Sequence, residues 1–316
     1  MLIPKPRGAF SEALFAGMHC WPGEEPTAPG GPPDGAEDAA IALWTLYELH
    51  YRGFDDADDS LEWHPTLLGV RRVLEEDLEQ RLRSRFPGHR ADGDFATAFF
   101  RYVAAHGGRS LAAYVQREAT EEQVLDVLRL RSVYHLKESD PTTWVVPRLP
   151  TGAKAALMEL QYDEYGVGDP NRLHAHLFAR GLEACGLRSE YGAYVDEVPL
   201  EILEQNNAMS LMGLHRRLRS AALGHLAAFE ATSSLPSRRL AQGLRRLGFA
   251  DEMVAYYEEH VAADAIHEQT AVRLVLGALL EVEPELTDDA WFGAFTCIDL
   301  EDRVAARLMS QWGASA

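Results

Sequence analysis

Residues 251–281 read DEMVAYYEEHVAADAIHEQTAVRLVLGALLE, and this stretch decides how the fold is interpreted. Its apolar residues recur three and four positions apart, as in the series Met253, Tyr257 and Val261, and it contains no proline. This is the spacing of an amphipathic helix, because residues three and four apart share one face. We predict one long helix whose apolar stripe faces the core.

Three ionisable residues interrupt the apolar stripe of this helix. His260, Asp264 and His267 occupy positions i, i+4 and i+7, so they share its core-facing row. Burying such groups without partners would cost several kcal/mol each, and a bound metal ion is a common compensation. The alternative is that the two histidines form hydrogen bonds to Asp264 and that no metal is involved.

The rest of the chain is also predicted to be helical. Residues 20–37, CWPGEEPTAPGGPPDGAE, are rich in proline and glycine and are predicted to form a loop. No stretch alternates between apolar and polar residues as a strand does, so helices packed as a bundle are the predicted architecture. The expected helices cover residues 37–52, 66–86, 120–140, 154–165, 170 onward, 211–234, 251–281 and 288 onward.

Carboxylates near other predicted helices extend the candidate site. Glu230 is placed at the end of the strongly apolar helix at 211–234, where a carboxylate needs a cation. Either a metal ion or an ion pair with Arg238 or Arg239 would supply one. Four more carboxylates crowd the ends of two neighbouring helices, as a solvated acidic face or as ligands: Glu138, Glu159, Asp163 and Glu164.

Composition and charge exclude several classes of partner. The chain has 316 residues and a formal net charge of −19, which would repel both nucleic acid and an anionic membrane surface. Cys20, Cys185 and Cys297 are far apart in the sequence and cannot all pair, which indicates a reducing compartment. The sequence has no signal-peptide pattern and no apolar run long enough to cross a bilayer. We expect a cytoplasmic protein.

Four motifs then occur in order along the chain: LKESDPTTW (136–144), LMELQYDEYGVGDPNRLHAHLF (157–178), GHLAAFEATSSLPSRR (224–239) and YEEHVAADAIHEQ (257–269). With ALWTLYELHYRGF (42–54), this set resembles the iron-containing redox enzyme family, within the haem-oxygenase-like di-iron oxidase and oxygenase superfamily. The resemblance implies an all-α, haem-oxygenase-like helical bundle with an N-terminal helical extension. Residues 1–110 would form the extension, packed on a metal-binding domain at 111–316.

The resemblance also implies a set of metal ligands. Glu164 would bridge two irons, and all of the ligands except Glu138 would take part directly in catalysis. Some relatives carry glutamate where this chain has Asn171, three residues before His174, and an amide is a weaker ligand, so the second iron would be held less tightly. The implied ligands are Glu138, Glu164, His174, Glu230, His260, Asp264 and His267.

Several other polar residues lie near these motifs. His135, one turn from Glu138, is the first substitute for it as a ligand. His176 points to the opposite side of a helix from His174 and is excluded from the ligand set. His215 and His225 flank the strongly apolar helix, and they are kept out of the ligand set and interpreted as structural. Three further residues are interpreted as structural, or as hydrogen-bond partners of a substrate: Tyr165, Asn206 and Asn207.

The function implied by the family is O2-dependent oxidation at non-haem iron. The expected cofactor is Fe(II), as two ions, with O2 as co-substrate and a small-molecule metabolite as substrate. We expect an external electron donor, because no flavin, nicotinamide or iron–sulfur motif is present, and we allow for a homodimer. Members of the family catalyse different reactions, so the substrate stays open. The alternatives are a metal-free enzyme of the same fold and a ferritin-like iron-binding protein without substrate turnover.

Overall fold

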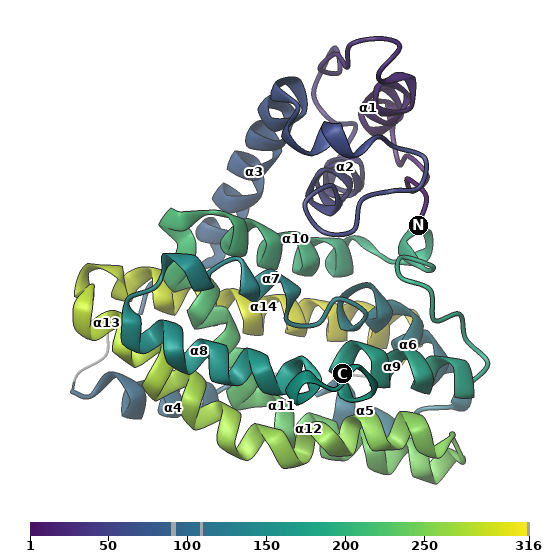
Figure 1. The fold of residues 1–316 in the computed structure, drawn as a ribbon. Helices are drawn as coiled ribbons and strands as arrows, with labels where there is room; N and C mark the ends of the chain where they lie inside the picture. Colours follow the sequence, from purple (N-terminus) through teal and green to yellow (C-terminus); the bar gives the residue numbers. More distant parts are fainter. Residues whose placement is uncertain (90–92, 108–109, 315–316) are drawn as a thin grey trace.

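The structure is a computed structural model that describes residues 1–89, 93–107 and 110–314, except for the side chains of 262–266. All regular structure in these residues is helical, and no strand occurs among them. The first three α-helices form a tier at the top of Figure 1. They are α1 (Ala9–Cys20), α2 (Ala36–Glu48) and α3 (Pro65–Arg85).

A bundle of helices lies below this tier and contains the C-terminal two thirds of the chain (Figure 1). Its short N-terminal helices are α4 (Phe95–Ala104), α5 (Leu111–Arg117), α6 (Glu121–His135) and α7 (Asp140–Thr143). The helices that follow are α8 (Thr151–Glu164), α9 (His174–Ala184), α10 (Leu200–Leu214) and α11 (Arg219–Leu247). The last are α12 (Asp251–Gln269), a π-helix (Thr270–Gly277), α13 (Ala278–Val282) and α14 (Thr287–Gln311).

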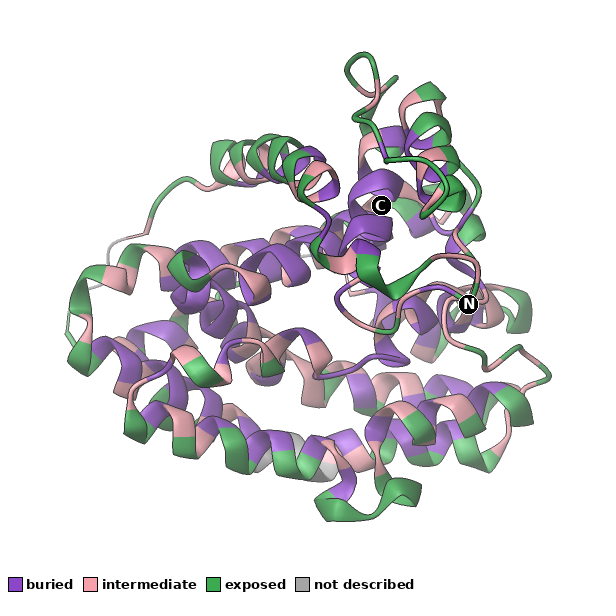
Figure 2. Ribbon diagram, turned by 45° about the horizontal axis from the view of Figure 1, so that its top comes forward, coloured by how far each residue is buried: buried purple, intermediate pink, exposed green. Residues whose placement is uncertain are grey.

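Helix α11 is the centre of the bundle and packs most extensively against α12 and α14. It crosses α14 closely, because a methyl group on Gly293 would lie 1.9 Å from the carbonyl oxygen of Ala221. The reciprocal position, Gly224, faces the carbonyl of Ala290 in the same way. Buried residues line the interior faces of the helices and exposed residues lie outside (Figure 2). The crossing thus brings two backbones together where larger residues would hold them apart.

The N-terminal tier is joined to the bundle through α2, which packs on α10. At this junction the ammonium of Lys137 contacts the carboxylate of Glu48, and both side chains are almost completely buried. The hydroxyl of Tyr191 donates to the other oxygen of Glu48 at 2.5 Å. The Lys137 ammonium also lies 4.4 Å from the centre of the Tyr51 ring. This network ends one residue before Glu138.

Most of the predicted helices are present, with three changes near the candidate ligands. Thr120 and Gln123 form a capping box at the start of α6, but α6 ends at His135, so Glu138 lies in the following turn and not in a helical turn. That turn ends in Ser139, whose φ of 69° interrupts the helix before Pro141. The sequence pattern does not indicate that Ser139 adopts a left-handed conformation. The helix predicted to end at residue 140 therefore ends earlier in the structure, at His135.

The helix predicted at 211–234 is two helices in the structure. Helix α10 ends at Leu214, and α11 starts at Arg219 and continues through Pro236 to Leu247. Glu230 therefore lies in the middle of α11, and its predicted place at a helix end is wrong. A proline removes only one backbone donor, and the packing of α11 on both sides holds the helix across it.

The third change concerns the start of α9, and the helix predicted at 251–281 agrees more closely with the structure. The run predicted at 251–281 is helical throughout, although its residues 270–277 form a π-helix. The helix expected from residue 170 is a short 3-10 turn, and α9 begins at His174 itself. Across the described part of the chain, no helix is both long enough and apolar enough to cross a membrane.

Candidate metal centre

Two groups of three buried side chains lie inside the bundle. In the first group, one potential ligand atom from each of Glu138, His174 and His260 lies within 4.8 Å of the others. The second group meets the same criterion with Glu164, Glu230 and His267. Five separate segments supply them: the turn after α6, the ends of α8 and α9, the middle of α11, and α12. Each residue is at most 7% exposed, so a packed interior surrounds both groups.

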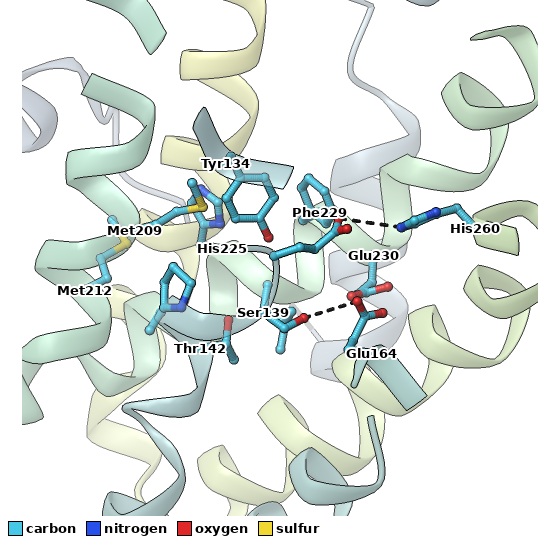
Figure 3. A pocket seen from close by; sticks show the side chains of 14 residues that line it. Tyr134, Ser139, Thr142, Glu164, Met209, Met212, His225, Phe229, Glu230 and His260 are labelled. Atoms are coloured by element: carbon cyan, nitrogen blue, oxygen red, sulfur yellow. Dashed lines mark hydrogen bonds and ion pairs between the residues drawn. The ribbon is translucent and has the colours of Figure 1, made fainter. Parts of the chain in front are cut away.

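Glu164 connects the two groups. Its Oε2 lies 3.0 Å from Nδ1 of His174 in the first group, and its Oε1 lies 3.4 Å from Nδ1 of His267 in its own group. Oε2 also accepts a hydrogen bond of 3.2 Å from the hydroxyl of Ser139 (Figure 3). One carboxylate oxygen thus faces each group, which is the geometry that a bridging carboxylate needs.

Two of the imidazoles are oriented by hydrogen bonds on the side away from Glu138, Glu164 and Glu230. Nδ1 of His260 donates to the carbonyl oxygen of Tyr256 at 2.8 Å, since a carbonyl can only accept. In the neutral ring, Nε2 then carries the lone pair, and it lies 3.5 Å from Oε1 of Glu138. Nε2 of His267 pairs with Oδ2 of Asp163 at 3.1 Å, which leaves Nδ1 toward Glu164 and Glu230. Histidine ligands of metals are commonly held in this way.

The nitrogens that face the carboxylates lack hydrogen bonds. Nδ1 of His174, Nε2 of His260 and Nδ1 of His267 are all buried, and none forms a hydrogen bond within the described part of the chain. Buried polar atoms are rarely left in this state. A metal ion bound by these nitrogens would satisfy each of them, so the donor set fits a metal.

The electrostatics of the site also favour a bound cation. Burial by itself lowers the pKa of His260, but the negative charge of Glu138 outweighs it and raises the pKa to about 10. Burial likewise lowers the pKa of His267, but the neighbouring Glu230 carboxylate outweighs it and raises the pKa to about 9. The pKa of His174 is raised against burial by Glu164. The carboxylates therefore create a strongly negative interior that attracts protons or metal ions.

A model of the family described as "Iron-containing redox enzyme" matches residues 125–302, which is more than half of the chain and includes both groups. The chain belongs to the iron-containing redox enzyme family. This confirms the resemblance drawn from the four motifs. No curated protein matches the sequence of this family member.

A solved structure with a similar fold is that of a CadD-like protein of unknown function from Nostoc punctiforme PCC 73102. The two chains share 17% sequence identity with a TM-score of 0.50, and the match covers 76% of this chain and 98% of that one. At this identity the likeness concerns the fold alone. It confirms the all-α helical bundle for this member of the iron-containing redox enzyme family.

Glu138 is held by two residues that the sequence did not single out as its partners. The hydroxyl of Tyr256 donates to Oε2 of Glu138 at 2.9 Å and also lies 2.8 Å from Nδ1 of His135. Nδ1 of His135 is 3.2 Å from Oε1 of the same carboxylate. Burial raises the pKa of Glu138, but the charges of His135 and His260 outweigh it, and the pKa is well below its usual range. Glu138 is therefore an oriented carboxylate anion.

The structure brings together six of the seven candidate ligands. The seventh, Asp264, lies outside the described side chains, so its position stays a prediction. His135 contacts Glu138 but belongs to neither group of three. Asn171 is exposed and donates to Asp169, which places it away from both groups. His176 is exposed too, as its exclusion from the ligand set required.

Other residues considered from the sequence have structural partners. Tyr165 donates to Asp140, Asn206 to the carbonyl of Ile202, and Asn207 to the carbonyl of Ala40. His215 forms an ion pair with Glu75. The roles of Ser139, Asp163 and Tyr256 could not be predicted from the sequence, because each acts through a tertiary contact. The signal available for the first two is that they are adjacent in sequence to Glu138 and Glu164.

A cavity opens beside the candidate centre (Figure 3). It is a small cavity of about 30 Å³, large enough to hold ordered water. Glu138, Glu164, Glu230 and His260 line one part of it. The remainder is mostly apolar, with side chains that include Tyr134, Met209, Met212, Leu226 and Phe229.

Proposed function

We propose that this protein binds two Fe(II) ions, one in each group of three, and is an O2-dependent oxidase or oxygenase that acts on a small-molecule metabolite. The observation that carries the proposal is the pair of buried groups joined through Glu164. A mixture of carboxylate and imidazole ligands from several helices is how helical bundles hold di-iron sites. Membership of the iron-containing redox enzyme family supports the same metal.

The chemistry of the donors supports iron over a structural zinc ion. Zinc in structural sites takes four ligands in a tetrahedron, commonly with thiolates. Neither group contains a cysteine, and each combines oxygen and nitrogen ligands, which suit Fe(II). In this proposal Asp264 joins one of the groups as a further ligand. The open positions beside the cavity would then be available to O2 and substrate.

Different residues of the chain would have different roles in the reaction. Bound Fe(II) would supply the electrons and the coordination positions that O2 activation needs. Glu138, oriented by Tyr256 and His135, and Glu164, oriented by Ser139, would neutralise the charge of the metals. The apolar wall of the cavity would exclude water and hold the substrate. Repeated turnover would draw further electrons from an external donor.

Anaerobic loading with Fe(II) tests this proposal. After removal of loose iron, elemental analysis should find one iron for each group, and the loaded protein should consume O2 at a rate that an appropriate metabolite increases. Protein that retains no iron would favour a metal-free enzyme of this fold. O2 consumption that stops once the bound iron is oxidised, whatever metabolite is added, would favour a ferritin-like iron-binding protein.

A further inference from the structure

The two ends of the cavity differ in chemistry. The acidic end is lined by Glu164, Glu230 and His260, whereas Met209, Met212 and His225 lie at the opposite end (Figure 3). The side chains between them are largely apolar. A molecule in the cavity would therefore meet the candidate ligands at one end and a single imidazole at the other.

His225 has no evident role in the fold. It lies in the apolar part of α11, it is only 7% exposed, and it belongs to neither group of three. Its Nε2 is buried and forms no hydrogen bond within the residues that the structure describes. An unsatisfied buried polar atom destabilises the folded state, so an apolar residue would be more stable here unless a ligand completes the site.

The cavity provides hydrogen bonding without positive charge at this end. Burial lowers the pKa of His225 to about 4, so the ring is neutral near pH 7. No lysine or arginine is among the described residues that line the cavity. An anionic group placed there would lose its hydration without gaining a counter-charge. An uncharged donor or acceptor would lose much less.

The small volume of the cavity restricts the substrate further. A cavity of about 30 Å³ admits only a short chain, unless the side chains rearrange. Met209 and Met212 form the wall beside His225, and methionine adapts readily because it is unbranched and flexible. The cavity can therefore lengthen at this end more easily than at the rigid acidic end.

We propose that His225 hydrogen-bonds an uncharged polar group, such as a hydroxyl, at the far end of a short apolar substrate whose other end faces the candidate metal ligands. This assignment rests on the proposed function, since it uses the same cavity. His225 would act as a positioning and specificity residue. It would fix which carbon of the substrate lies beside the metals.

Binding of matched probes to the Fe(II)-loaded protein under anaerobic conditions tests the assignment. 1-Butanol and pentane have the same number of heavy atoms and differ in one hydroxyl group. His225→Phe should weaken 1-butanol binding about tenfold, the loss expected for one hydrogen bond, and leave pentane binding unchanged. Butanoate, whose carboxylate should face the metals, should also be unaffected. Calorimetric titration measures each affinity.

The controls separate this assignment from the proposed function. Iron content and melting temperature are measured for every variant, and His225→Leu replaces His225→Phe if the larger side chain prevents folding. Equal weakening of 1-butanol and pentane would overturn the assignment, because it would show a purely structural role. Stronger weakening of butanoate than of 1-butanol would overturn it as well. Wild-type protein that retains no iron would instead contradict the proposed function.

Discussion

His260 and His267 each direct one ring nitrogen toward the carboxylates and the other toward an acceptor. His267→Ala removes a ligand from the group that contains Glu164 and Glu230, and we expect it to lose the iron of that group. The first group keeps its three residues and should retain its iron. Elemental analysis after anaerobic loading measures the difference.

The matched control for this change is His176→Ala, which removes an exposed imidazole from the same part of the fold. Iron content should equal that of the wild type. If His267→Ala also left the iron content unchanged, His267 would be excluded from the site.

Protons compete with iron for the same nitrogens. In the metal-free protein His260 and His267 have pKa values of about 10 and about 9, so both imidazoles are protonated near pH 7. A metal ion binds only the neutral ring, and its binding must therefore release protons. We predict that the Fe(II) affinity rises with pH until about 9 to about 10, where the rings become neutral without metal.

Anaerobic calorimetric titration at pH 7 in buffers of different ionisation enthalpy measures this proton release. Binding heats that do not depend on the buffer would contradict the predicted protonation of His260 and His267.

At the residue scale, the sequence predicted ligand types better than their supporting partners. His260 and His267 were found from helical spacing, Glu230 from its apolar surroundings, and Glu164 from the family motif. Tyr256 could not be predicted as a partner of Glu138, because the two are far apart in the sequence and meet only through the packing of α12 on the rest of the bundle.

At the scale of the elements, the points where helices cross determine where the ligands lie. Gly293→Ala places a methyl group against the carbonyl of Ala221 and forces α11 and α14 apart. We expect a loss of about 1–3 kcal/mol in the free energy of unfolding, typical of an overpacked core, measured by urea denaturation.

Gly69→Ala is the control for this substitution. Gly69 lies exposed within α3 with nothing within 4 Å of the added methyl group. Alanine is the better helix former, so the free energy of unfolding should rise by roughly 0.5–1 kcal/mol. A Gly293→Ala protein as stable as the wild type would show that the helices separate without cost.

Most elements could be predicted from apolar periodicity, and their ends could not. The helix at 211–234 was joined across His215 and ended before Pro236, because neither the short break at residues 215–218 nor a proline tolerated inside a helix has a reliable local signal. The π-helix at Thr270–Gly277 was likewise invisible in the sequence pattern. Such segments often lie at functional sites, and this one begins three residues after His267.

At the scale of the whole molecule, the N-terminal tier and the bundle share the buried pair of Glu48 and Lys137. We propose that residues 1–110 and 111–316, the two parts expected from the sequence, fold as one unit, because this pair joins them and α4 (Phe95–Ala104) of the first part packs within the bundle. Glu48→Gln leaves the Lys137 ammonium buried without its counter-charge. The free energy of unfolding should fall by about 3–5 kcal/mol, with loss of iron because Lys137 precedes Glu138.

The double variant Glu48→Leu with Lys137→Met tests the cause of this loss. It removes both charges at once, and it should recover much of the stability and the iron content. Urea denaturation and elemental analysis measure both quantities. A Glu48→Gln protein that unfolds like the wild type would indicate that the tier and the bundle are independent.

The central claim is that two metal ions lie in the bundle and share Glu164. An anomalous-diffraction crystal structure of the Fe(II)-loaded protein measures this directly. We predict two iron peaks about 3.5–4 Å apart, one coordinated by Glu138, His174 and His260 and the other by Glu230 and His267, with an oxygen of Glu164 on each. A single iron peak, or peaks away from these residues, would contradict the account.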